Sequence, residues 1–214
     1  RWRHRPTSVA GGPPLASAAG FACLATFTSS GCGDEVQVQR LTRAELMDPA
    51  SCQSCHPQQF SDWSGSMHAY AAEDPVFLAM HERAQQESNG ALGDFCVKCH
   101  APLAVAQGAL ADPLAVAKLP ASLKGVTCYF CHATSSIEGT HNNPLQLAAD
   151  GTLFGPFGDP VASTPHRSSY SALFDLARPE SAAACGTCHD IVNGHGAAVE
   201  RTYSEWQSTL FVDP

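Results

Sequence analysis

Apolar side chains recur at helical spacing in two stretches, residues 57–72 and 75–87, and each stretch begins with proline. The apolar positions are Phe60, Trp63 and Met67 in the first stretch and Phe77, Leu78 and Met80 in the second. Because positions three and four apart share one face of a helix, and proline suits a first turn, this pattern predicts two helices. Aromatic side chains at this spacing are typical of packing against a flat apolar body.

Residues 133–184 show no such periodicity. Five helix and strand breakers gather in this stretch, namely Gly151, Gly155, Pro156, Gly158 and Pro160. The composition predicts a long loop. The stretch is also too short to fold by itself, so we expect one folded domain.

The first 31 residues have the order of a secretory signal. Arg1, Arg3 and Arg5 precede an uncharged run, within which residues 15–27 are rich in Ala, Leu and Phe. A basic segment followed by an apolar one and then small residues is typical of export. We therefore expect a protein of the periplasm or cell surface.

Residues 28–32 resemble the lipobox of bacterial lipoproteins, in which cleavage before a cysteine leaves its thiol to be acylated. Ser29 stands where that motif usually has leucine, so lipidation of Cys32 and ordinary cleavage nearby both stay open. No later apolar stretch approaches the roughly 20 residues that a membrane-spanning helix needs. Any membrane contact is thus expected only through a lipid at Cys32.

Four Cys-x-x-Cys-His pentads carry the chemistry of the chain. The cysteine pairs are Cys52 and Cys55, Cys96 and Cys99, Cys128 and Cys131, and Cys185 and Cys188, followed by His56, His100, His132 and His189. In a c-type haem site the two thiolates bond the porphyrin vinyl groups and the histidine ligates iron. Zinc knuckles and redox dithiols share the cysteine spacing, but neither needs histidine directly after the second cysteine. The pentads therefore predict four covalently attached c-type haems.

The two remaining cysteines, Cys23 and Cys32, precede the first pentad, so no disulfide framework is left to build. All twenty acidic residues follow Gly31, and removal of the signal leaves nine basic residues against them, a net charge of −11. Nucleic acid is disfavoured as a partner, and a redox partner with a basic docking face is favoured. Plain solubility is the alternative reason for an acidic surface.

The expected layout is a signal segment at residues 1–31, a linker at 32–48 and a tetrahaem cytochrome c domain at 49–214. About 46 residues are available for each haem, too few to bury a large side-chain core. The porphyrins must then supply much of the apolar interior. We expect a mainly α fold with long loops, with short helices wrapped around a stacked haem core and little or no sheet.

The sixth ligand of each iron decides whether a haem only transfers electrons or also binds a substrate. Outside the pentads and the signal segment, the candidate ligands are His68, His81, His141, His166 and His195. This supply makes bis-histidine coordination the expected state for most irons. Met67 and Met80 are alternative thioether ligands.

The setting of each histidine limits what it can reach. His68 follows the first pentad on the same predicted helix and should ligate a different haem, whereas His166 follows a Pro-rich loop that could carry it to the fourth. His141 lies on a loop and could serve the first or second haem. His81 suits solvent exposure as well as ligation. His195 lies between Gly194 and Gly196, where flexibility allows ligation, but its short tether to His189 disfavours the opposite face of the same haem.

Five strings of this chain resemble multihaem cytochromes related to the tetrahaem cytochrome c that accepts electrons from hydroxylamine oxidoreductase. They lie between about Cys52 and Phe211 and read SCQSCHPQQFSDWSGSMHAYA, FCVKCHAPLAV, LKGVTCYFCHATSSIEGTHNNP, ACGTCHDIVNGHG and VERTYSEWQSTLF. The resemblance implies haems in close pairs, some parallel and some nearly perpendicular.

The resemblance also implies a ligand set, in which His68 ligates the third haem and His166 the fourth, and the second haem has an open axial site. In the relative, the first haem takes a histidine from between the second and third pentads. This chain has no histidine between His100 and His132. His141 or His81 must therefore substitute, or that site stays open.

Electron transfer is the leading functional hypothesis, because closely spaced irons with bis-histidine ligation form a wire and no catalytic acid/base group is evident. An enzyme is therefore the less favoured class. The first alternative is a haem enzyme that acts on a small nitrogen or sulfur compound at one five-coordinate iron. The second is a subunit of an extracellular cytochrome filament, formed by self-association.

Overall fold

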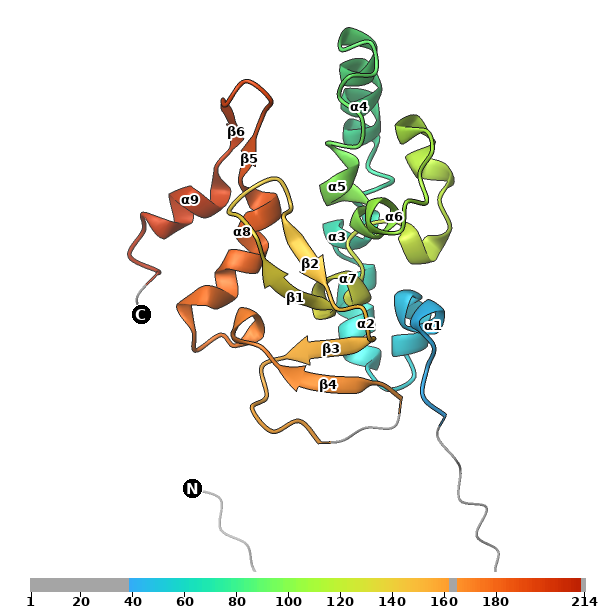
Figure 1. Ribbon diagram of the computed structural model, residues 1–214, viewed down its shortest axis with the longest axis vertical. Helices are drawn as coiled ribbons and strands as arrows, with labels where there is room; N and C mark the ends of the chain where they lie inside the picture. Colours follow the sequence, from blue (N-terminus) through green and yellow to red (C-terminus); the bar gives the residue numbers. More distant parts are fainter. Residues whose placement is uncertain (1–38, 162–164, 213–214) are drawn as a thin grey trace, which may run out of the picture. The chain divides into compact units, whose positions relative to one another are not determined.

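Every described element up to His132 is a helix, and short paired strands and further helices follow (Figure 1). The computed structural model describes residues 39–161 and 165–212. The expected signal segment 1–31, with Cys23, and the candidate lipidation site Cys32 lie outside the described residues. The chain from Gln37 onward forms one unit, to which all that follows refers.

Helices dominate the order of elements. The α-helices are α1 (Arg43–Met47), α2 (Pro57–Ser64), α3 (Met67–Tyr70), α4 (Pro75–Glu87), α5 (Val97–His100), α6 (Pro102–Ala106), α7 (Cys128–His132), α8 (Ala183–His189) and α9 (Thr202–Gln207). The 3₁₀ helices are η1 (Pro49–Cys52), η2 (Pro113–Lys118), η3 (Ala121–Leu123), η4 (Ala172–Phe174) and η5 (Pro179–Ala182). The strands are β1 (Thr134–Ile137), β2 (Leu145–Leu147), β3 (Thr152–Gly155), β4 (Arg167–Tyr170), β5 (Ile191–Val192) and β6 (Ala198–Glu200).

The helix predicted over residues 75–87 is confirmed as α4, with the Asp74 carboxylate accepting a hydrogen bond from the Val76 amide at its N-terminus. The single helix predicted over residues 57–72 is wrong. Gly65 ends α2, and Ser66 begins α3 as its N-cap, with its hydroxyl accepting from the Ala69 amide. A glycine followed by a capping residue breaks the helix although the apolar spacing continues through it.

The strands form three two-stranded sheets: β1 with β2 and β5 with β6 are antiparallel, and β3 with β4 is parallel. The prediction of a long loop over residues 133–184 is therefore only partly right, since β1 to β4 lie within it. Each of these strands has at most four residues, too few for an alternating pattern to stand out in the sequence. The predicted class, mainly α with long loops and little sheet, is confirmed.

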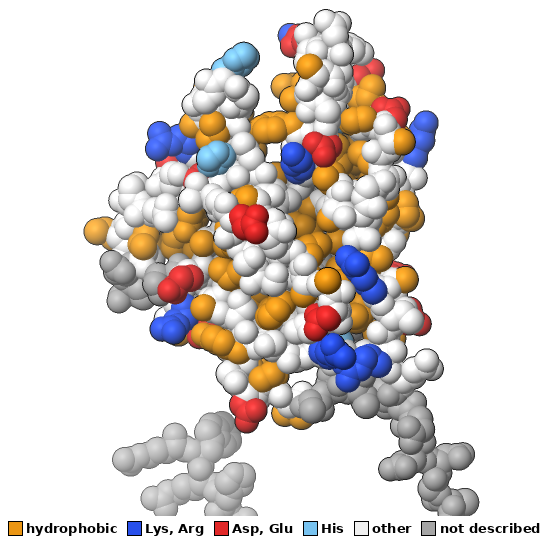
Figure 2. Space-filling view, in the orientation of Figure 1, with side chains coloured by type: hydrophobic (Ala, Val, Ile, Leu, Met, Phe, Trp, Pro, Cys, Tyr) orange, Lys and Arg blue, Asp and Glu red, His pale blue; other side chains and the backbone are white. Residues whose placement is uncertain are grey.

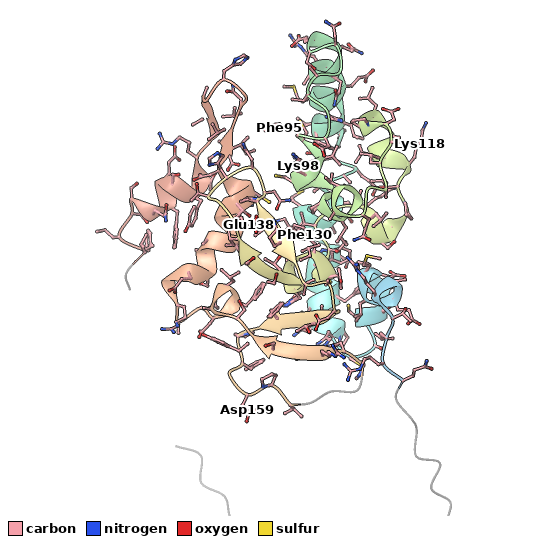
Figure 3. All side chains as sticks on the ribbon, in the orientation of Figure 1. Phe95, Lys98, Lys118, Phe130, Glu138 and Asp159 are labelled. Carbon is pink, nitrogen blue, oxygen red and sulfur yellow. The ribbon has the colours of Figure 1, made fainter. Side chains whose placement is uncertain are left out.

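The side-chain core is small and lies in the first part of the chain. One cluster joins α4, α5, α6 and η2 around Phe77, and the other joins α1, α6 and α7 around Leu103 and Phe130, the last labelled in Figure 3. All twelve buried hydrophobic residues in the described ranges lie between Leu46 and Ala133. Leu145, Leu147 and Leu153 of β2 and β3 pack against the second cluster. The elements after β3 contribute no residue to either cluster and therefore need some other apolar body to pack against.

Gly125 makes a close backbone contact just before the third pentad. Its φ of +65° is a left-handed conformation, and a Cβ there would lie 2.5 Å from the carbonyl oxygens of His68 and Ala69. The Val126 amide donates to the His68 carbonyl at 2.8 Å, and the Trp63 indole donates to the Val126 carbonyl at 2.8 Å. The third pentad is thereby anchored to the helix that carries His68.

The substitution Gly125→Ala should lower the free energy of unfolding by about 2 kcal/mol or more, because the methyl group adds a clash to left-handed strain. Thermal unfolding of the purified protein measures the loss. Gly158→Ala is the matched control, since that glycine has no positive φ and no atom within 4 Å of its Cβ position. Equal melting temperatures for the two variants would contradict the role of this contact.

Candidate haem sites

Each pentad folds as a single helical turn. The second, third and fourth pentads end α5, α7 and α8 with their histidines, and His56 of the first stands directly before α2. The amides of His56 and His100 donate to the carbonyls of Cys52 and Cys96, four positions earlier, at 2.8 and 3.2 Å. Both sulfurs and the histidine of each pentad thus lie on one turn, as attachment to one porphyrin edge requires.

The setting of Cys131 fits a thiol at the edge of a large apolar group. Its side chain is exposed, yet the protein atoms around it raise its pKa to about 12, chiefly by desolvation and then by repulsion from Cys185 and Cys188. The fold after Ala133 also lacks buried hydrophobic side chains among its described residues. The residues present therefore fit covalent haem.

Thiols of different pentads are neighbours. The thiols of Cys52 in the first pentad and Cys128 in the third interact, which lowers the pKa of Cys128 to about 7 and raises that of Cys52. Cys99 of the second pentad is paired in the same way with Cys188 of the fourth, with the pKa of Cys99 raised and that of Cys188 lowered.

The third and fourth pentads are joined by the interaction of Cys131 with Cys185 and Cys188. Neighbouring pentads therefore follow the order first, third, fourth, second. This spatial order differs from the order of the pentads in the chain.

Two histidines outside the pentads lie opposite pentad histidines. The ring centres of His166 and His56 are 6.4 Å apart, and those of His68 and His189 are 6.3 Å apart. Two imidazoles on opposite faces of one metal ion have ring centres about 6 Å apart, because each metal–nitrogen bond is about 2 Å and each ring centre lies about 1 Å further out. Both pairs fit the axial ligands of a haem iron.

These pairs differ from the ligand set that the family resemblance implies. His68 faces His189 of the fourth pentad, whereas the resemblance implies the third haem. His166 faces His56 of the first pentad, whereas the resemblance implies the fourth haem. The Leu41 amide donates to the Pro165 carbonyl at 2.8 Å, which holds His166 beside the segment that leads into the first pentad. The break after α2 redirects α3, and with it His68.

The histidines of the second and third pentads have phenylalanine neighbours. His100 stacks on Phe77 with ring centres 3.8 Å apart, and His132 stacks on Phe174 at 5.4 Å. Their Nδ1 atoms bond the carbonyls of Ala71 and Phe154 at 2.8 and 2.7 Å, which leaves Nε2 for a metal. Desolvation lowers the pKa of His100 and favours the neutral, ligating form, against the opposing effect of its bond to Ala71. In the described ranges no histidine ring stacks on His100 or on His132.

His81 lies in the core beside the second pentad, because its ring and that of His100 both stack on Phe77. Its side chain is 1% exposed, its Nε2 lies 3.1 Å from the carbonyl of Pro113, and its ring stacks on Phe77. The bond joins α4 to η2. The predicted solvent exposure of His81 is therefore wrong, and its Nε2 is engaged by the Pro113 carbonyl.

His141 and His195 are exposed, and no ring contact joins either one to another described residue. His141 lies in the loop between β1 and β2, with its Nδ1 3.2 Å from the Thr140 hydroxyl, and His195 lies in the turn between β5 and β6. The structure thus brings neither of them opposite a pentad histidine, and their role as ligands stays a prediction.

Asn143 joins the second and fourth pentads, a role that the sequence did not reveal. Its amide donates to the Thr187 carbonyl at 2.7 Å, and its side chain donates to the carbonyl of Lys98, which Figure 3 labels on α5. Asn142 and Asn143 both have positive φ, a conformation that asparagine tolerates better than most residues. The Asn-Asn pair before Pro144 was the available signal for a tight turn.

Glu200 on β6 approaches the fourth pentad. Its Oε1 lies 3.7 Å from Nδ1 of His189. The corresponding atoms of His100 and His132 face backbone carbonyls, so His189 differs from them in having a carboxylate neighbour. A carboxylate at this position raises the basicity of a ligating imidazole.

Comparisons with known proteins agree with this geometry. Residues 51–133, which contain the first three pentads, match the family described as cytochrome c554 and c-prime. A solved structure, a penta-haem cytochrome c552 from Thermochromatium tepidum, is similar with a TM-score of 0.53 and 21% sequence identity over 80% of this chain. The chain has the fold of a multihaem c-type cytochrome. It spans 51% of the length of that structure's chain, and no curated protein matches it.

The family match over residues 51–133 and the shared fold agree with pentads that hold covalently bound c-type haem. Within the part of this cytochrome fold that is described, no three His, Cys, Asp or Glu side chains converge as the ligands of a metal ion, as a zinc knuckle would require. None of the described helices is both long and apolar enough to cross a bilayer.

Replacement of Glu200 by glutamine should raise the reduction potential of the haem on His189 by roughly 60 mV, a tenfold shift for one electron, because the neutral amide stabilises the oxidised iron less. Spectroelectrochemical titration measures this change. Glu205→Gln on α9 is the matched control and should leave all potentials in place. Equal shifts in the two variants would show only an effect of net charge.

His81→Leu should lower the free energy of unfolding by about 1–3 kcal/mol, since it leaves the buried Pro113 carbonyl without its partner. The visible and EPR spectra should stay those of the wild type, because His81 is engaged in the core. A new high-spin signal in this variant would instead identify His81 as an axial ligand.

Proposed function

We propose that this chain is an exported electron-transfer protein that carries electrons through four covalently bound c-type haems. The observation that carries the proposal is the contact between thiols of different pentads. Because each thiol bonds the edge of its porphyrin, neighbouring thiols bring haem edges close together, and electron transfer is fast only over short distances. The haems then form one continuous path in the order first, third, fourth, second.

The ligands support transfer at both the first and fourth haems. His56 with His166, and His68 with His189, would close both axial positions of their irons. An iron with two protein ligands has no position for a substrate and changes its coordination little on reduction. These two haems therefore serve transfer alone.

Redox chemistry on a small nitrogen or sulfur compound is the second candidate function. The observation that favours it is the pair of phenylalanine contacts at His100 and His132, where no described histidine ring lies opposite. An iron with one protein ligand can bind a small molecule. The second haem lies at one end of the proposed path and is the better placed of the two for such a reaction.

The net negative charge of the chain after the signal segment supports a redox partner with a basic docking face. The excess of acidic residues after Gly31 attracts a positively charged docking face and accelerates encounter at low salt. Export, with periplasm and cell surface as the two locations, follows from the signal-like segment and from haem attachment outside the cytoplasm.

Intact mass should show four haems on the chain, and EPR should show low-spin signals from the two bis-histidine irons. His166→Ala and His68→Ala should each convert one low-spin haem to a high-spin one by removing its second ligand. Gln86→Ala, at an exposed position of α4, is the control and should leave the spectra unchanged. Fewer than four haems, or unchanged spectra in both ligand variants, would contradict the proposal.

Binding of cyanide or nitric oxide separates the two functions. If the wild type binds neither, all its irons are closed and the electron-transfer function stands alone. If it binds either one at a haem on His100 or His132, the second candidate gains support.

A further inference from the structure

Basic side chains gather beside the first haem site. A cavity of about 190 Å³ is lined by Arg40, Arg43 and Arg167 together with Leu41, Leu46, Ala149, Asp150, Gly151 and His166. Figure 2 shows Lys and Arg side chains clustered in this region, where α1 and β4 meet in Figure 1. We call Arg40, Arg43 and Arg167 the first-haem basic patch.

The patch is strongly positive for so acidic a chain. It holds three of the nine basic residues that follow the signal segment. Neither Arg40 nor Arg43 forms an ion pair with a described residue. Arg167 lies 3.3 Å from Asp150, but both side chains are more than half exposed, so water screens this pair. The residues that line the cavity therefore carry a net charge of +2.

The patch lies at an end of the proposed electron path. His166 lines the cavity, and its ring faces His56 of the first pentad. The thiol of Cys52 in the first pentad interacts with Cys128 of the third, which puts the first pentad at one end of the proposed order. A partner that docks on the patch comes close to the first haem.

We propose that the first-haem basic patch docks the acidic face of a redox partner. The inference rests on the proposed electron-transfer function and adds to it the place and charge of one partner. Guanidinium groups bind carboxylates through paired hydrogen bonds, and their field acts locally even though the net charge of the chain is negative. A basic partner would use the acidic surface elsewhere on the chain.

The test measures electron exchange between the haem-loaded protein and two small probes, ferricyanide as an anion and hexaammineruthenium as a cation. Stopped-flow measurements give the rates at low and high salt. At low salt, the double variant Arg40→Gln/Arg43→Gln should react about fivefold more slowly with ferricyanide than the wild type, and faster with hexaammineruthenium. The double variant Arg83→Gln/Lys118→Gln changes the net charge equally on α4 and η2, where Figure 3 labels Lys118, and should have little effect.

Polyglutamate serves as a macromolecular acidic probe. It should slow the ferricyanide reaction of the wild type and of the control variant, but not that of the patch variant. Equal rates and equal inhibition in the two double variants would overturn the docking proposal.

Two further outcomes have distinct meanings. A shifted potential of the first haem in the patch variant, with an unchanged salt dependence, would overturn the proposal, because the arginines would then hold the propionates of that haem. Failure of the wild type to exchange electrons with either probe would instead overturn the proposed function itself.

Discussion

Covalent attachment of haem is the constraint on which the interior of this fold depends. The buried residues of the clusters around Phe77 and Leu103 all lie at or before Ala133, and of the later elements β2 and β3 pack against the second cluster through Leu145, Leu147 and Leu153. Beyond them, the described chain is held by hydrogen bonds and by contacts such as that of the Tyr203 ring over Gly186. Such an arrangement requires an apolar body between the elements, and the thiols of the four pentads fix where that body is bonded.

Hydrogen bonds between loops then set the relations among the sites. Asn143 bonds backbone atoms of the second and fourth pentads, and Asp190, directly after His189, accepts bonds from the amide and hydroxyl of Ser204. These contacts hold α9 and the loop after β1 against α8. Residues that ligate no iron therefore determine how far apart the irons lie.

The parts that could be predicted from the sequence are those specified by neighbouring residues. The pentads identify themselves within five positions, and α4 has a proline, an N-cap and apolar spacing within thirteen. The partners of the irons depend instead on residues far apart in the chain. His166 reaches His56 because of a bond between Leu41 and Pro165 that no local pattern encodes. The break at Gly65 and Ser66 is local, but its consequence is not: it changes the direction of α3, and only the folded molecule shows that His68 then faces His189.

The bond between Val126 and the carbonyl of His68 has a consequence for how the molecule matures. His68 faces the fourth pentad, yet its helix is held by the segment that enters the third. The segment that enters the third pentad therefore helps to position the second ligand of the fourth iron. The sites are then coupled through the protein, so a change in the packing around one haem would reach the axial ligand of another.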